Sequence, residues 1–189
     1  VAVDDPVHIS ALSAAATAAG VLQGVLIEVN VGLPRCGVAP EKAVTLAELV
    51  DKSPGLLLRG IMGYEGHLVL LDDEDRRVPE TKKSMTLLVS AAKSIRDCGL
   101  TCDIVSAGGT GTYNVTGAFP GITEVQAGSY VMMDTKYDRL GLGFEKAVTI
   151  LSAVQSTALD GWAIIDAGVK VMTNDFGLPD LIGVADTKL

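Results

Sequence analysis

The chain has 189 residues and a net charge of −8, with 48% hydrophobic residues, 21 glycines and 4% aromatic residues. A negative chain repels the phosphates of nucleic acid, and no run of about 18 apolar residues is free of polar side chains. We therefore expect neither a nucleic-acid partner nor a membrane-spanning segment. The composition is typical of an α/β protein rich in alanine, valine and leucine.

Three cysteines stand at irregular spacing, at Cys36, Cys98 and Cys102. An odd number of cysteines is a poor disulfide framework and indicates a reducing compartment, so we expect a cytoplasmic protein. Few histidines are present and no Cys-x-x-Cys pair occurs. We therefore interpret the three thiols as small buried hydrophobic side chains and not as metal ligands.

Short apolar runs alternate with longer segments of helical periodicity. A proline near the start and a glycine beyond the end predict the first helix, over residues 6–19. Two further helices are expected to begin at Pro40 and at Pro79, the latter ending near Gly99. Strands are predicted at residues 1–3, 25–31, 56–62, 102–105 and 123–125. This alternation predicts βαβ units and a parallel sheet.

The pattern changes after residue 146, where β segments follow one another without helices. We predict them at residues 148–157, 162–166 and 170–172, too few to close a barrel or sandwich. The sequence therefore predicts two domains, an α/β domain over residues 1–146 and a β-domain over residues 147–189.

Two glycine-rich loops follow predicted strands and form the strongest candidate site. Residues 106–112 are Ser-Ala-Gly-Gly-Thr-Gly-Thr, and residues 126–130 are Gln-Ala-Gly-Ser-Tyr. Small residues let backbone N–H groups approach a phosphate, and the hydroxyls add donors. The spacing matches neither a P-loop nor a dinucleotide fingerprint. The competing interpretation is a pair of tight turns without a ligand.

Three other side chains follow predicted strands, where α/β folds place their chemistry. Arg35 could pair with a phenolate or carboxylate, or form only a surface ion pair. Tyr64 could lie against an aromatic cofactor, or only at the rim of a pocket. His67 could act as an acid or base, or only as a hydrogen-bonding loop residue. We interpret the charged run at residues 72–77 as a solvated approach to the next helix.

Four motifs in this order resemble one family. They are Val-Gly-Leu-Pro-Arg-Cys-Gly-Val at 31–38, Gly-Tyr-Glu-Gly-His at 63–67, Ser-Ala-Gly-Gly-Thr-Gly-Thr-Tyr at 106–113 and Gln-Ala-Gly-Ser-Tyr-Val-Met-Met-Asp at 126–134. The pattern is similar to that of D-threonine aldolases and D-3-hydroxyaspartate aldolases, which are fold-type III pyridoxal-phosphate enzymes related to alanine racemase. The resemblance implies a partial TIM-type (β/α)8 barrel, about strands four to eight, followed by the start of a β-domain.

The resemblance also implies roles for individual residues. Arg35 would lie near the ring hydroxyl of pyridoxal phosphate, and Tyr64 would pack on or beside the ring. Gln126 would face the pyridine nitrogen, where the racemases place an arginine. A neutral partner there suits carbon–carbon cleavage better than racemisation. The residues implied around the phosphate are Ser106, Gly108, Gly109, Thr110, Gly111, Thr112, Gly128, Ser129 and Tyr130.

Two parts of the family pattern are not matched. The resemblance implies a Schiff-base lysine at the end of a first barrel strand, whereas this chain starts at what resembles strand four. It also implies a divalent metal, manganese or similar, with His and Asp or Cys ligands near the C-terminus. We therefore expect a fragment of a longer polypeptide that is inactive alone.

The implied activity of the intact protein is a metal-assisted lyase reaction that splits D-threonine or a similar D-3-hydroxy amino acid into glycine and an aldehyde, with His67 as a proton shuttle. A D-serine dehydratase-like enzyme is the rival within the same class. Outside that class, the candidates are a non-catalytic pyridoxal-phosphate carrier, which would lack the β segments, and a sugar-phosphate-binding barrel. The racemase relatives build their sites across a dimer, so a homodimer is expected by analogy.

Overall fold

The computed structural model describes residues 1–184 and divides the chain into two compact units, Val1–Gly128 and Ser129–Leu189. The first unit holds most of the regular structure and all of the long helices. The domain boundary predicted at residue 146 stays a prediction.

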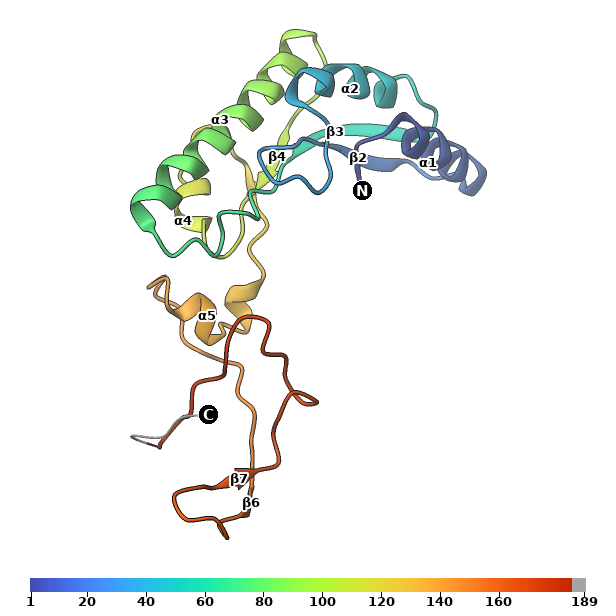
Figure 1. The fold of residues 1–189 in the computed structure, drawn as a ribbon. Helices are drawn as coiled ribbons and strands as arrows, with labels where there is room; N and C mark the ends of the chain where they lie inside the picture. The colour runs from blue at the N-terminus through green and yellow to red at the C-terminus, as the bar shows by residue number, and fades with distance from the viewer. Residues whose placement is uncertain (185–189) are drawn as a thin grey trace. The chain divides into compact units, whose positions relative to one another are not determined.

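A five-stranded sheet forms the centre of the first unit, and all of its neighbouring strands are parallel (Figure 1). Its spatial order, β1-β2-β3-β4-β5, is the same as the order along the chain. The strands are β1 (Ala2–Val3), β2 (Gln23–Glu28), β3 (Leu56–Met62), β4 (Ile104–Ala107) and β5 (Glu124–Val125). The predicted α/β fold with a parallel sheet is confirmed.

Helices connect these strands. They are α1 (Pro6–Ala19), a short 3₁₀ turn η1 (Pro40–Lys42) that leads into α2 (Ala43–Asp51), α3 (Glu74–Asp97) and the single-turn α4 (Tyr113–Thr116). Neighbouring helices α1, α2 and α3 pack against one another and on the sheet (Figure 1). The core between these layers is made of aliphatic side chains, including Ile27, Ile61 and Leu88. This layering is the one that alternating strands and helices predict.

The first helix has the ends that the sequence predicts. The Asp5 side chain accepts a hydrogen bond from the Val7 N–H, and Pro6 occupies the first turn, where its missing N–H costs nothing. Gly20 ends the helix with a left-handed φ of 65°. Both boundaries of α1 are therefore confirmed.

The predicted start of α3 at Pro79 is wrong, because the helix begins five residues earlier, at Glu74. Asp73 caps it by accepting from the Arg76 N–H, and acidic residues fill its first turn, next to the positive end of the helix dipole. Pro79 lies inside the helix on an exposed face, where water can satisfy the carbonyl that its ring leaves unpaired. The charged run is thus helical from Glu74 onward, and Arg77 within it is buried, with Nη1 donating to the Leu71 carbonyl at 2.6 Å.

Two other expectations are corrected in this unit. The predicted strand at residues 25–31 is β2, which ends at Glu28, although the Val29 N–H still donates to the Met62 carbonyl of β3 at 2.8 Å. The backbone leaves β3 at Asn30, because its N–H donates to the Val38 carbonyl at 2.8 Å instead. The cysteines are not all buried: Cys102 is, whereas Cys36 and Cys98 are exposed.

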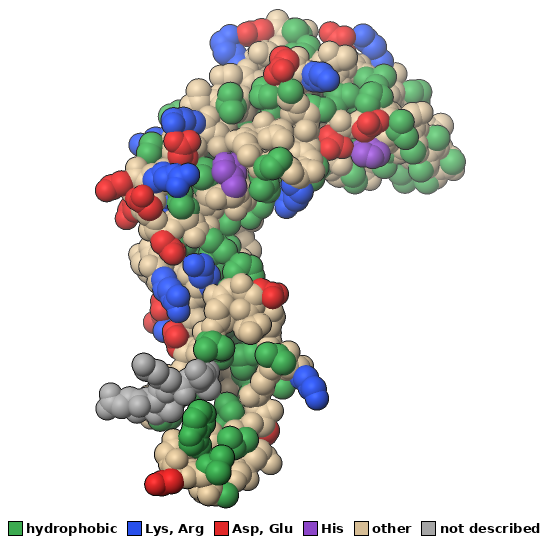
Figure 2. Space-filling view, in the orientation of Figure 1, with side chains coloured by type: hydrophobic (Ala, Val, Ile, Leu, Met, Phe, Trp, Pro, Cys, Tyr) green, Lys and Arg blue, Asp and Glu red, His purple; other side chains and the backbone are tan. Residues whose placement is uncertain are grey.

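The second unit has little regular structure within residues 129–184. It contains a 3₁₀ turn η2 (Ser129–Val131), a one-turn helix α5 (Thr135–Asp138) and an antiparallel pair, β6 (Val154–Ser156) and β7 (Ile164–Ile165). The predicted β segment at residues 170–172 is wrong, because the N–H groups of Val171 and Met172 both turn back to the Gly168 carbonyl. Hydrophobic side chains are visible on the surface of the second unit in Figure 2, and Trp162 and Phe176 are among the exposed ones.

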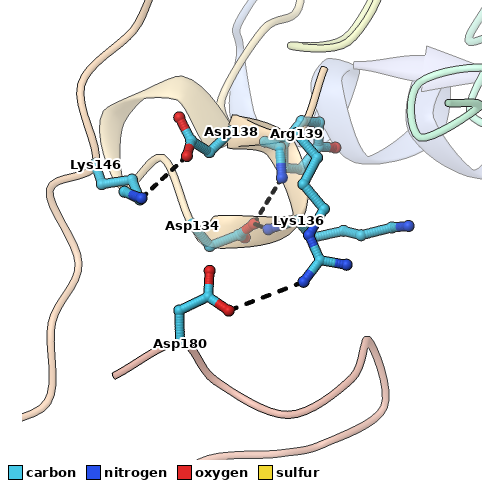
Figure 3. Close-up of polar contacts among 7 residues, drawn as sticks. Asp134, Lys136, Asp138, Arg139, Lys146 and Asp180 are labelled. Carbon is cyan, nitrogen blue, oxygen red and sulfur yellow. Dashed lines mark hydrogen bonds and ion pairs between the residues drawn. The ribbon is translucent and has the colours of Figure 1, made fainter. Parts of the chain in front are cut away.

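Half-exposed ion pairs connect parts of this second unit (Figure 3). Asp134 caps α5, Lys146 pairs with Asp138 at 3.0 Å, and Arg139 lies 4.0 Å from Asp180. Pairs with this exposure contribute little stability. Within residues 1–184, no helix combines the length and apolarity needed to cross a bilayer.

Candidate functional site

The site is built at one edge of the parallel sheet. Because the strands run in the same direction, their carboxyl ends lie side by side. The loop at 63–67 follows β3, the glycine-rich loop at 108–112 follows β4, and Gln126 follows β5. The structure therefore brings three of the predicted segments to the same edge.

A buried carboxylate that was not among the predicted site residues forms hydrogen bonds with the glycine-rich loop. Glu65 has 0% of its surface exposed. Its Oε2 accepts from the Gly108 N–H at 3.0 Å, and its Oε1 accepts from the hydroxyls of Thr112 at 2.8 Å and Thr116 at 2.7 Å. The sequence signal that could have indicated Glu65 is an acidic residue placed between Gly63 and Gly66, just after a buried strand. An acidic residue in such a position is ordinarily interpreted as part of a solvated loop.

The same loop packs closely on the segment after β3. A Cβ added to Gly111 would stand 1.6 Å from the Val69 carbonyl oxygen. One added to Gly109 would lie 2.8 Å from Val69 Cγ1 and 3.2 Å from Tyr64 Cε2. These glycines are required because backbone and an aromatic ring approach them closely. The loop therefore lies directly beside the Tyr64 ring, with Thr110 buried within it.

Ser106 connects β4 to β5 at the same edge. Its hydroxyl donates to Glu124 Oε1 at 2.5 Å and accepts from Gln126 Nε2 at 2.9 Å. Ser106 is buried, whereas Glu124 and Gln126 are exposed. A hydroxyl has one proton, and Ser106 donates it to the Glu124 carboxylate. The Ser106 oxygen can therefore only accept from the Gln126 amide. This chain of hydrogen bonds sets the orientation of the Gln126 side chain.

Arg35 lies over the Tyr64 ring, with its guanidinium carbon 5.2 Å from the ring centroid. Its Nη2 is 4.0 Å from Glu28 Oε1, and the side chain is 56% exposed. Hydrogen bonding with Cys36 and the nearby charge of Glu28 raise the pKa of Arg35, so the guanidinium stays charged. Beside this pair is a shallow hollow, open to solvent and too small to enclose a water molecule, lined by Glu28, Val29, Asn30, Val31, Leu33, Arg35, Cys36 and Tyr64.

His67 is exposed and lies against the loop that follows β2. A Cβ on Gly32 would stand 2.8 Å from His67 Cε1, and Gly32 has a φ of +131°. The imidazole thus packs next to the loop that carries Arg35, which places it near the hollow. Its predicted role in proton transfer stays a prediction.

Three other predicted residues follow β5. Gly128 is exposed, with nothing within 4 Å of the position of a Cβ. Ser129 and Tyr130 belong to the second unit, where the Tyr130 ring lies 5.3 Å from that of Phe144. The part of these three residues in holding a phosphate stays a prediction.

The described part of the chain shows neither a metal centre nor a lysine anchor at this edge. Residues 1–184 contain no group of three or more His, Cys, Asp or Glu side chains that could hold a metal ion. The loops at 32–38, 63–67, 108–112 and 126–130 contain no lysine. The edge of the sheet therefore offers an aromatic face, a guanidinium and a glycine-rich loop.

This chain is similar to characterised enzymes over most of its length. The family model for the alanine racemase N-terminal domain matches residues 1–136. The 3-hydroxy-D-aspartate aldolase of Paracoccus denitrificans is 34% identical over 100% of this chain and 51% of its own length. The D-threo-3-hydroxyaspartate dehydratase of Delftia is 31% identical over 81% of this chain and 42% of its own length.

A crystal structure agrees with these sequence matches. That of D-threonine aldolase from Filomicrobium marinum superposes with a TM-score of 0.91 at 36% identity, covering 95% of this chain and 50% of that one. The chain thus spans about half the length of the curated aldolases it matches.

Proposed function

Because the chain belongs to the alanine racemase N-terminal domain family of fold-type III pyridoxal-phosphate enzymes, we propose that the protein carrying it is a pyridoxal-phosphate-dependent lyase. It would cleave D-threonine or a similar D-3-hydroxy amino acid into glycine and an aldehyde. The similarity to two aldolases, over nearly the whole chain, supports this reaction. The single structural observation that carries the proposal is the glycine-rich loop directly beside the Tyr64 ring.

The residues at this edge fit a phosphorylated aromatic cofactor. A Cβ at Gly109 would meet Val69 and Tyr64, so the glycine lets the loop lie against the Tyr64 ring. An aromatic face for a planar ring and a loop of small residues for a phosphate are therefore side by side. When bound, pyridoxal phosphate supplies an electron sink for charge that develops at the substrate's α-carbon. The protein's part is to bind and orient this group.

Tyr64 would hold one side of the cofactor ring, and Arg35 would lie near the ring hydroxyl. The contact between these two side chains supports that arrangement, because it fixes the guanidinium beside the aromatic surface. Gln126 would face the pyridine nitrogen as an uncharged partner. Its hydrogen bond to Ser106 supports this role, since it limits the rotation of the amide.

His67 would move a proton near the substrate, because it is exposed and packs beside the loop that carries Arg35. A divalent metal ion belongs to the proposal for the intact protein only by resemblance. The described residues do not fit such an ion, so it takes part in no step proposed for them.

A dehydratase is the second candidate, and the similarity to the Delftia enzyme favours it. Both reactions begin with the same bound substrate, but a dehydratase expels the β-hydroxyl as water and leaves the carbon–carbon bond intact. A non-catalytic cofactor carrier is less well supported, because β6 and β7 follow the α/β unit.

The products distinguish these candidates. The intact protein, saturated with pyridoxal phosphate and a divalent metal, is incubated separately with D-3-hydroxyaspartate and with D-threonine, and L-threonine is the stereochemical control for the latter. We expect equal amounts of glycine and acetaldehyde from the D-isomer alone. Ammonia and 2-oxobutanoate would instead identify the dehydratase, and no product from either D-threonine or D-3-hydroxyaspartate would contradict the lyase proposal.

A further inference from the structure

Glu65 is a charged residue that none of the proposed steps uses. It lies between β3 and the glycine-rich loop and is fully buried. A buried carboxylate is strongly unfavourable unless several donors satisfy it. Here, three donors do so, at 2.7 to 3.0 Å, and all of them come from the segment between Gly108 and Thr116. The carboxylate therefore fixes this one segment to the end of β3.

The protons of the loop can be assigned from these contacts. The Thr112 hydroxyl has a single proton, which it donates to Glu65 at 2.8 Å while its oxygen accepts the Gly109 N–H at 3.1 Å. The Gly108 N–H is donated to the same carboxylate. Three donors of the loop are thus directed inward, at Glu65 or at Thr112.

Gly108 also shows why the loop needs such a restraint. Its φ is +84°, and the position of a Cβ would be 3.0 Å from Thr116 Cγ2. The chain makes a left-handed turn directly at the carboxyl end of β4 and passes close to α4. The hydrogen bond from Gly108 to Glu65 holds the turn at this point.

We propose that Glu65 is a positioning residue for the phosphate-binding loop, and that Thr112 acts through Glu65 without touching the phosphate. This inference rests on the proposed function, because it takes the loop at 108–112 as the phosphate site. Charge alone would make a buried carboxylate repel a phosphate. Glu65 therefore contributes to the site through geometry, because it holds the loop and its remaining hydrogen-bond donors in one conformation.

Three variants of the intact protein test the inference. Glu65→Gln keeps the shape but removes the negative charge, so none of the three hydrogen bonds is charge-assisted any longer. Its NH₂ group either faces the Gly108 N–H, which then loses its acceptor, or reverses the direction of the bonds with the two hydroxyls. Thr116→Val removes one contact to Glu65, changes no charge, and lies outside the loop itself. Thr112→Val removes the hydroxyl that the family resemblance assigns to the phosphate. The matched controls are Glu48→Gln and Thr86→Val, two exposed positions on α2 and α3.

The readout is the dissociation constant for pyridoxal phosphate and, separately, for pyridoxal, which lacks the phosphate. We expect each of the three variants to weaken pyridoxal phosphate binding by about tenfold, the scale of one charge-assisted hydrogen bond, and pyridoxal binding by less than about twofold. A general loss of structure would weaken both ligands equally. The controls should bind both ligands as the wild type does.

Equal weakening of both ligands would overturn the inference, and so would wild-type affinity for pyridoxal phosphate in Thr116→Val and Glu65→Gln. Weakening by Thr112→Val alone would make Thr112 a direct ligand. If Glu65→Gln does not fold, Thr116→Val decides between these results. A wild-type protein that binds no pyridoxal phosphate would instead overturn the proposed function, which is a separate failure.

Discussion

Replacing Gly111 by alanine tests whether the glycine-rich loop is packed as the structure shows. The new Cβ would stand 1.6 Å from the Val69 carbonyl oxygen and 2.5 Å from the Val69 carbonyl carbon. Real Cβ contacts do not fall below 3.0 Å, so the two backbone segments must separate by about 1.4 Å. Neither side of this contact is a flexible side chain that could rotate away.

The expected cost follows from that overlap. Inserting a methyl group into a packed region typically costs about 1–3 kcal/mol, and a contact between two backbone segments lies at the upper end or beyond. We expect Gly111→Ala to lower the free energy of unfolding by at least about 3 kcal/mol. Gly128→Ala is the matched control, since nothing lies within 4 Å of its Cβ position, and it should stay within about 1 kcal/mol of the wild type.

Urea unfolding followed by far-ultraviolet circular dichroism measures this difference, because the long helices all belong to the unit that contains Gly111. A lower midpoint with an unchanged slope reports a loss of stability. If Gly111→Ala unfolds at the same urea concentration as Gly128→Ala, the loop does not lie against Val69, and the description of the site is wrong.

Two other parts of the first unit give further predictions. Thr81 on α3 has a buried hydroxyl without a hydrogen-bond partner, so Thr81→Val should raise the free energy of unfolding by about 1 kcal/mol in the same urea assay. A decrease of about 1 kcal/mol in that free energy would mean that the hydroxyl does have a partner. Burial raises the pKa of the Cys102 thiol, so an alkylating reagent should modify Cys36 and Cys98 in the folded protein and Cys102 only after unfolding. The unfolded chain loses the Cys102 proton at lower pH than the folded one does. Stability should therefore fall as the pH rises above 9.0, and a Cys102→Ala variant with an unchanged pH slope would contradict this linkage.

The sequence predicted helix boundaries well where residues at the ends of a helix determine where it begins and stops. Pro6, Asp5 and Gly20 define α1 by backbone chemistry that acts within a few residues. At α3 the proline signal was misleading, because Asp73 caps the helix and Pro79 is tolerated on an exposed face. A proline in the second turn costs less when water reaches the carbonyl it leaves unpaired, and exposure cannot be read from spacing.

The candidate site was predictable in its segments but not in its contacts. Parallel strands place the loops after β3, β4 and β5 at one edge, and the spacing of the motifs was enough to find them. Glu65 was missed because its three partners are 43 to 51 residues away in the chain. The stacking of Arg35 on Tyr64 likewise depends on two loops that meet only in the folded protein.

Cofactor binding is tested most directly by native mass spectrometry of the intact protein, purified without added cofactor and again after incubation with excess pyridoxal phosphate. We expect one pyridoxal phosphate per polypeptide in at least the second sample, and its loss from a Tyr64→Ala, Gly109→Val double variant that remains folded by circular dichroism. A wild-type protein that takes up no pyridoxal phosphate under these conditions would contradict the central claim.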